Sequence, residues 1–178
     1  MNNKGFTLIE ILAAVTILGI LSVLAFDGYT KYATGAKKKS HDTMAKSASN
    51  AAEQFVMDNP GIAVETKKQV NGNVTTYVIK DANAVSVSFE DLVAEEYLSE
   101  TIDPDDKSRL CSGKVTIGLV KSDKKGALDR YIFVVDECCL AYKARYTYTY
   151  RDTTTVEDGQ TKVKTEFVEL KDKTHYVC

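Results

Sequence analysis

The sequence contains no tryptophan and only two histidines, and its charges almost cancel, with a formal net charge of −2 over 178 residues. Its longest basic run is Lys37-Lys38-Lys39, so no region is typical of a nucleic-acid-binding surface. No low-complexity segment or repeat period is present. Ten tyrosines and many threonines and valines, which favour strands, predict a β-rich distal part.

The sequence also lacks any recognisable arrangement of catalytic side chains. No nucleophile has a nearby base, no pair of carboxylates indicates acid–base chemistry, and no glycine-rich loop indicates phosphate binding. Neither histidine has a recognisable setting. We therefore expect no enzymatic activity, no catalytic residue and no cofactor.

Possible metal ligands have a simpler interpretation as well. Asp103, Asp105 and Asp106 could bind calcium, but aspartate is an ordinary turn residue and the run lacks the EF-hand pattern. His175 and the cysteines have the wrong spacing for known structural zinc motifs. We expect no metal site.

One carboxylate interrupts an apolar run that begins close to the N-terminus. From Phe6 to Phe26 every residue is apolar or small, except Glu10, two threonines and one serine. As an α-helix this run would be ~30 Å long, about the thickness of a bilayer core. A charge within such a helix is costly, so Glu10 marks a functional site whose partner has to be identified.

The segment Lys4-Gly5-Phe6-Thr7-Leu8-Ile9-Glu10 resembles the processing site of type IV pilins and type II secretion pseudopilins. The resemblance is close over residues 4–26 and looser in the helix that follows. It implies that a prepilin peptidase cuts between Gly5 and Phe6 and that Phe6 is then N-methylated. It also implies that Glu10 guides assembly by pairing with the N-terminal amine of a neighbouring subunit.

Elementary chemistry agrees with this pairing. Cleavage before Phe6 would create an α-amino group with a pKa near ~8, which is largely cationic at neutral pH. A carboxylate in hydrocarbon loses most of its energetic penalty when it pairs with an ammonium group. Glu10 would then be satisfied only at the correct stagger between helices. The alternative is a neutral Glu10, tolerated near the membrane interface.

A different processing route is also conceivable. Val23-Leu24-Ala25 could end an ordinary secretory signal peptide and release a soluble domain that begins near Phe26. Against this, the segment before the apolar run has one lysine, an acidic residue lies near the start of the run, and the run is unusually long.

Beyond the apolar run the pattern predicts an amphipathic continuation of the helix over residues 27–57. Met44, Ala48, Ala51 and Phe55 recur at 4-3-4 spacing. Pilins often carry a proline near the end of the apolar run, whereas this chain has Asp27-Gly28, which weakens a helix differently. A bend there and two separate helices are both compatible with the sequence.

The remainder, residues 58–178, predicts a β-rich globular head. Strands are expected at 64–70 and 74–79 around Asn71-Gly72, at 115–120 and 131–135 around Lys124-Lys125-Gly126, and at 142–151 and 162–170 around Asp158-Gly159, with a short helix at 89–98. The predicted fold class is α+β and pilin-like, a long N-terminal helix packed on a C-terminal antiparallel sheet. The predicted divisions are a leader at 1–5, an apolar helix at 6–26, an amphipathic helix at 27–57 and the head.

A stripe of tyrosines marks one face of the strand at 142–151. Tyr142, Tyr146, Tyr148 and Tyr150 alternate with polar residues, as expected for a strand with one buried face. We expect this face to pack in the core; a sugar-binding or surface-binding face is the alternative.

Four cysteines predict two disulfides in an exported chain. Cys138 and Cys139 are adjacent and rarely bridge each other, which leaves Cys111 and Cys178 to divide them. Pairing the strands at 115–120 and 131–135 brings Cys111 opposite one of the two. We favour Cys111–Cys139 and Cys138–Cys178. By resemblance, many pilins close a C-terminal region in this way.

Together these features predict a structural subunit, a prepilin, of a type IV pilus or pilus-like filament. The expected partners are copies of itself or related pilins, the prepilin peptidase, a platform membrane protein and an assembly ATPase. The chain would be a single-pass membrane protein before assembly and would lie in an extracellular filament afterwards. The alternatives are a pseudopilin of a secretion or DNA-uptake system, and a secreted or anchored surface binding domain.

Overall fold

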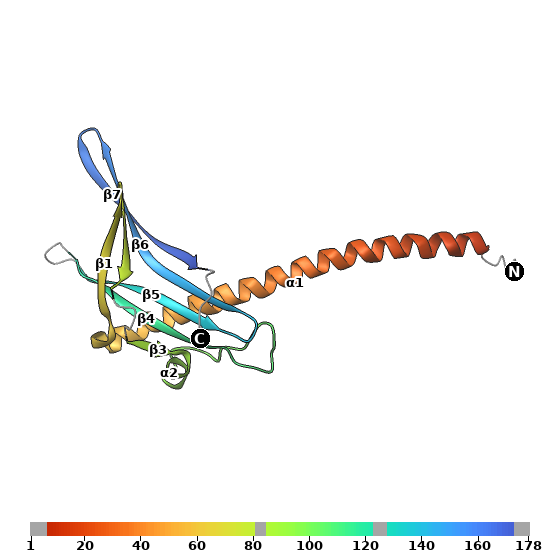
Figure 1. The fold of residues 1–178 in the computed structure, drawn as a ribbon, viewed down its shortest axis with the longest axis horizontal. Coiled ribbons are helices and arrows are strands. Elements are labelled where there is room, and N and C mark those ends of the chain that lie inside the picture. The colour runs from red at the N-terminus through yellow and green to blue at the C-terminus, as the bar shows by residue number, and fades with distance from the viewer. Residues whose placement is uncertain (1–6, 81–84, 123–127, 173–178) are drawn as a thin grey trace. The chain divides into compact units, whose positions relative to one another are not determined.

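A computed structural model describes residues 7–80, 85–122 and 128–172. The chain divides into two compact units, Met1–Ser40 and His41–Cys178, and helix α1, Leu8–Asp58, contributes to both. The helix is assigned without interruption through Asp27 and Gly28 (Figure 1), so the structure does not support two separate helices. The predicted α+β class, with a long N-terminal helix followed by a β-rich region, is confirmed.

The second unit contains the remaining elements. In chain order these are the 3-10 helix η1 Pro60–Ile62, β1 Val64–Asn71, β2 Val74–Ile79, β3 Ser86–Ser88, α2 Phe89–Ala94, β4 Ser112–Val120, β5 Arg130–Cys138, β6 Lys143–Glu157 and β7 Gln160–Asp172 (Figure 1). All six predicted strands are present, and β3 is an additional short strand. The turn predicted at residues 124–126 lies outside the described residues.

Two of the predicted hairpins turn over two residues, as their sequences indicate. In the β1–β2 hairpin Asn71 pairs with Val74, and Gly72 has φ 61°, as the first turn residue of a type II′ turn requires. In the β6–β7 hairpin both turn residues, Asp158 and Gly159, have positive φ, which is the type I′ pattern.

Five strands pair in a closed circuit. Strand β4 pairs with β5, β5 with β6, β6 with β2, and β2 with β1, all antiparallel. The start of β1 then pairs in parallel with the end of β4. Strands β3 and β7 lie outside this circuit, on β4 and β6 respectively. A small core cluster of Tyr77, Val120 and Ile132 joins β2, β4 and β5.

The main core packs the C-terminal part of α1 against the sheet. The apolar residues of its buried helix face are small, namely Ala45, Ala48, Ala51, Ala52 and Val56. The prediction placed Met44 and Phe55 on this face as well, but both are only half-buried at its margin.

Helix α2 is shorter than the predicted range of 89–98. It begins with a reciprocal capping box between Ser88 and Asp91. It ends in a Schellman motif, in which Glu96 has φ 63° and donates to the Val93 carbonyl, while the Tyr97 amide donates to the Leu92 carbonyl. The prediction missed this end because glutamate, unlike glycine, does not signal a left-handed residue.

Candidate functional site

The N-terminal end of α1 is closed by a hydrogen-bonded cap. Oε2 of Glu10 accepts hydrogen bonds from the Thr7 amide and the Thr7 hydroxyl, both at 2.8 Å. The Glu10 amide in turn donates to the Thr7 hydroxyl oxygen at 3.4 Å. Thr7 and Glu10 therefore form a capping box, with Thr7 as the N-cap residue and Glu10 as the N3 residue.

This cap is a second role for Glu10 that the sequence analysis did not identify. The spacing Thr-x-x-Glu before an apolar run is the signature of a capping box and was available in the sequence. Both bonds from Thr7 use Oε2, and Oε1 has no hydrogen-bond partner among the described residues. Oε1 therefore remains available to a cation from another molecule. The predicted processing residues Gly5 and Phe6 lie outside the described residues.

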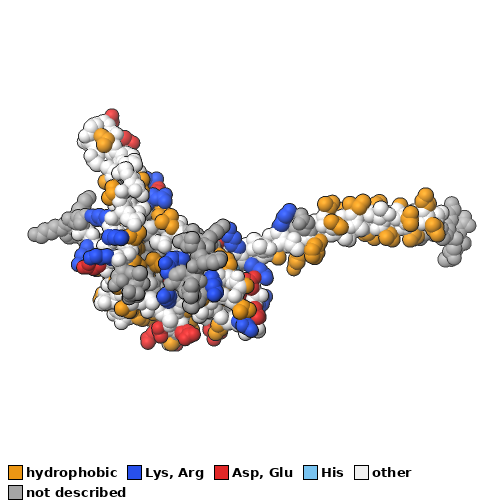
Figure 2. Space-filling view, in the orientation of Figure 1, with side chains coloured by type: hydrophobic (Ala, Val, Ile, Leu, Met, Phe, Trp, Pro, Cys, Tyr) orange, Lys and Arg blue, Asp and Glu red, His pale blue; other side chains and the backbone are white. Residues whose placement is uncertain are grey.

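The helix that follows this cap is apolar and exposed on every side. All residues from 7 to 26 are solvent-exposed, including Leu8 at 85% and Phe26 at 70% (Figure 2). The hydroxyls of Thr16 and Ser22 donate to helix carbonyls one turn earlier, at 2.7 Å each. The polar side chains other than Glu10 are thus satisfied within the helix, as a segment in lipid requires.

By length and composition α1 is able to cross a membrane. A helix that is apolar all round is normally covered by lipid or by other protein. Within residues 8–26, Glu10 is the only charged residue, and its distance from the helix start is a single turn. This segment is therefore the candidate functional site for insertion and assembly.

The predicted disulfide between Cys111 and Cys139 is confirmed. It follows from the register of β4 and β5, in which Ser112 pairs with Cys138, so that the flanking residues 111 and 139 face each other with Cα atoms 4.4 Å apart. Cys138 is disulfide-bonded as well. Its predicted partner, Cys178, lies outside the described residues.

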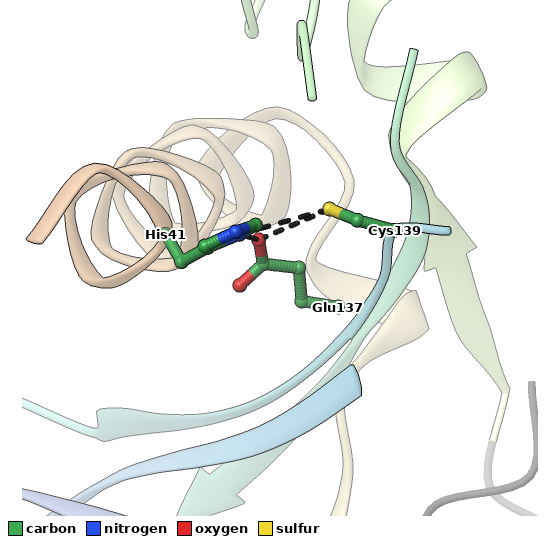
Figure 3. Close-up of side chains that lie close together, drawn as sticks. All are labelled: His41, Glu137 and Cys139. Atoms are coloured by element: carbon green, nitrogen blue, oxygen red, sulfur yellow. Dashed lines mark hydrogen bonds and ion pairs between the residues drawn. The ribbon is translucent and has the colours of Figure 1, made fainter. Parts of the chain in front are cut away.

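A buried polar cluster lies where α1 packs on the head, and the sequence analysis missed it. His41 of α1 is 1% exposed, and the Glu137 side chain on β5 is fully buried. Nδ1 of His41 lies 2.5 Å from Oε1 of Glu137 (Figure 3). The ring of Tyr142 stacks on the imidazole with centroids 3.9 Å apart. His41 is one turn before Ala45 on the buried face of α1. This spacing is the one feature of the sequence that could have predicted its burial.

Two aspartates of the loop before β4 lie beside this histidine. Oδ2 of Asp105 is 3.5 Å from Nε2 of His41. Asp103 is 1% exposed and accepts bonds from the Asp105 amide at 2.7 Å and the Leu140 amide at 3.3 Å. Asp106 points to other partners and accepts hydrogen bonds from the amide and hydroxyl of Ser108. The turn role predicted for these aspartates is therefore visible in the hydrogen bonds.

The tyrosine stripe packs mainly in the core, as predicted. Tyr146 and Tyr148 are buried in the main cluster, and Tyr142 and Tyr150 are half-buried. Burial raises the pKa of the Tyr146 hydroxyl well above its ordinary value, as does its hydrogen bond with Tyr142. Burial likewise raises the pKa of Tyr148. These hydroxyls remain neutral and serve packing.

Comparison with known proteins gives one family match. Residues 1–26 match the family described as the prokaryotic N-terminal methylation motif, which is the prepilin signal of type IV pilins and pseudopilins. The match supports a pilin-like or pseudopilin precursor in general, and it implies processing by a prepilin peptidase. No solved structure matches the chain.

Proposed function

We propose that this chain is the structural subunit of a type IV pilus or pilus-like filament, and not an enzyme. The observation that carries the proposal is the joint presence of the methylation motif and an apolar helix that is exposed on every side. The apolar surface of this helix has to be buried. Lipid buries it before assembly, and neighbouring helices bury it in a filament.

Cleavage between Gly5 and Phe6 gives Glu10 a partner that the precursor lacks. The new amine of Phe6 is largely cationic at neutral pH. Thr7 remains in the mature chain, so the cap on Oε2 of Glu10 survives cleavage, and Oε1 can accept the amine of a neighbouring subunit. The cap thus orients the carboxylate, and the pairing selects the stagger between adjacent helices.

The proposed partners and location follow from this mechanism. The subunit is held in the membrane by α1 until a platform protein and an assembly ATPase extrude it into an extracellular filament of its own copies or related pilins. The methylation motif is shared with pseudopilins. Filament length under the electron microscope distinguishes a pilus subunit from a pseudopilin of a secretion or DNA-uptake machine.

Three substitutions separate the two roles of Glu10. Glu10→Gln can still accept the bonds from Thr7 but carries no charge, so we expect it to be processed normally and to fail in assembly. Glu10→Asp keeps the charge on a shorter side chain, and we expect partial assembly. Thr7→Ala removes the side-chain cap and keeps the charge, so we expect filaments to persist.

The measurements are the amount of sheared surface filament and its appearance by electron microscopy, with electrophoretic mobility as the control for processing. If Glu10→Gln assembles as well as the parent chain, the charge pairing is wrong and Glu10 serves only as a helix cap. If Thr7→Ala abolishes filaments while Glu10→Gln does not, the cap alone is required.

A further inference from the structure

The buried cluster around His41 has the arrangement of a metal site. The Nε2 atom of His41 is buried and has no hydrogen-bond partner among the residues that the structure describes. It faces the loop that carries Asp103 and Asp105, and one ligand atom from each of these three residues lies within 4.8 Å of the others. A buried imidazole nitrogen without a hydrogen bond is costly, so it calls for an explanation.

The other ring nitrogen of His41 is fixed by Glu137. The Glu137 carboxylate oxygen, 2.5 Å from Nδ1, accepts a hydrogen bond from the Nδ1–H group, which leaves the lone pair on Nε2, on the side of the two aspartates. Histidines that bind metals almost always donate their second ring nitrogen to a carboxylate or carbonyl in this way. Stacking on Tyr142 further restrains the orientation of the ring.

Hydrogen bonds also fix the carboxylate of Asp103. Asp103 is oriented by two backbone amides, those of Asp105 and Leu140, and each of its oxygens keeps a further lone pair. The Asp105 side chain is 30% exposed, so a water molecule can reach the site. One imidazole, two carboxylates and one open position form a donor set suited to a four-coordinate ion.

We propose that His41, Asp103 and Asp105 bind a divalent transition-metal ion, for which zinc is the best fit. The 3.5 Å between His41 Nε2 and Asp105 Oδ2 is close to ~3.3 Å, the edge of a tetrahedron with bonds of ~2 Å. Calcium prefers six to eight oxygen ligands and is a poor match for an imidazole. Cys139 is not a ligand, because its sulfur is held in the disulfide.

The ion would join α1 to the loop before β4, and through Glu137 to β5. It would therefore fasten the C-terminal part of the helix to the sheet inside the second unit. The competing account is that Glu137 and Asp105 hold the imidazole of His41 directly, with no metal ion present. The two accounts differ in whether the protein takes up one metal ion per chain.

The test uses the full chain purified in detergent and stripped of metal with a chelator. Isothermal titration with zinc and elemental analysis after dialysis should show one ion per chain. Asp105→Asn should weaken zinc binding more than ~10-fold, since even outer residues of such sites contribute that much. Asp106→Asn is the matched control, because it removes the same charge from the same loop outside the site, and it should bind like the parent chain.

His41→Gln should also abolish uptake of the ion. Its folding is checked by circular dichroism, and if it does not fold, Asp105→Asn decides alone because that side chain is partly exposed. The proposal is overturned if the parent chain takes up no zinc, or if Asp105→Asn and Asp106→Asn bind zinc equally well. Because filament assembly is not measured, the result is independent of the function proposed for Glu10.

Discussion

At the scale of single residues, the proposed function gives each carboxylate oxygen of Glu10 a separate role. Oε2 caps the first turn of α1 through Thr7, and in the proposed mechanism Oε1 accepts the amine of a neighbouring subunit. A cap lowers the energetic penalty of the charge before assembly, because hydrogen bonds replace part of its hydration. The residue is thus tolerated in the membrane and is still able to pair in a filament.

Asp152 provides a test of electrostatics within the head. Partial burial works against its ionisation, but hydrogen bonds from Thr165 and Tyr77, together with the charge of Arg130, bring its pKa below the ordinary value. Because the folded pKa lies below the unfolded value of ~3.9, this stabilisation is complete above pH ~4. It is lost as the pH falls through the folded pKa.

We therefore expect Asp152→Asn to be less stable than the parent chain at pH 7 by about 1 kcal/mol, the typical net contribution of one intramolecular hydrogen bond. The difference should shrink as the pH falls below ~4. Urea unfolding at several pH values, followed by circular dichroism, measures it. A difference that stays constant down to pH ~3 would contradict the assigned pKa direction.

At the scale of elements, Gly113 on β4 is a position where no side chain fits. A Cβ atom there would lie 2.5 Å from the ring of Phe89 and 2.6 Å from the carbonyl oxygen of Asp136. The backbone of β5 cannot yield to it without loss of the strand pairing. The close approach of α2 and β5 to β4 thus depends on this glycine.

Gly113→Ala should lower the free energy of unfolding by about 1–3 kcal/mol, the cost of overpacking a core. Gly61→Ala is a matched control, because a Cβ there meets nothing within 4 Å. Urea unfolding of both variants checks the prediction. Equal stability of the two variants would show that β4 can shift to make room.

The elements that were predicted correctly are those with a local signal. Asp158-Gly159 located one hairpin because both residues of its turn adopt positive φ. Asn71-Gly72 located the other to within one residue, since Asn71 ends β1 opposite Val74 and the turn consists of Gly72 and Asn73. The end of α2 was missed because Glu96 adopts the left-handed conformation without a sequence signature. Strand β3 has three residues, too few for a periodic pattern to stand out.

The candidate sites that were predicted also have a local sequence signal, whereas the site that was missed has none. Glu10 was found because a charge in an apolar run is a local anomaly. The contact of His41 with Glu137 joins residues 96 positions apart, and no local pattern identifies such a pair. The disulfide between Cys111 and Cys139 was predictable because the register of the hairpin brings together two residues that are 28 positions apart in the sequence.

At the scale of the whole molecule, this disulfide closes the loop that contains β4 and β5 and restricts the unfolded chain. By the chain-entropy relation a loop closed over a sequence separation of 28 contributes about 3.5 kcal/mol. The double variant Cys111→Ser, Cys139→Ser should therefore unfold at lower urea concentration, with the change followed by tyrosine fluorescence because tryptophan is absent. An unchanged midpoint would show that the head does not depend on this bond.

The central claim is that an apolar helix enters the membrane as a precursor and leaves it as a filament core after one cut. Intact mass spectrometry with N-terminal sequencing of the mature protein from cells tests this most directly. We expect a chain that starts at Phe6 and carries one added methyl group. A chain that starts near Phe26, or one that retains Met1, would contradict it.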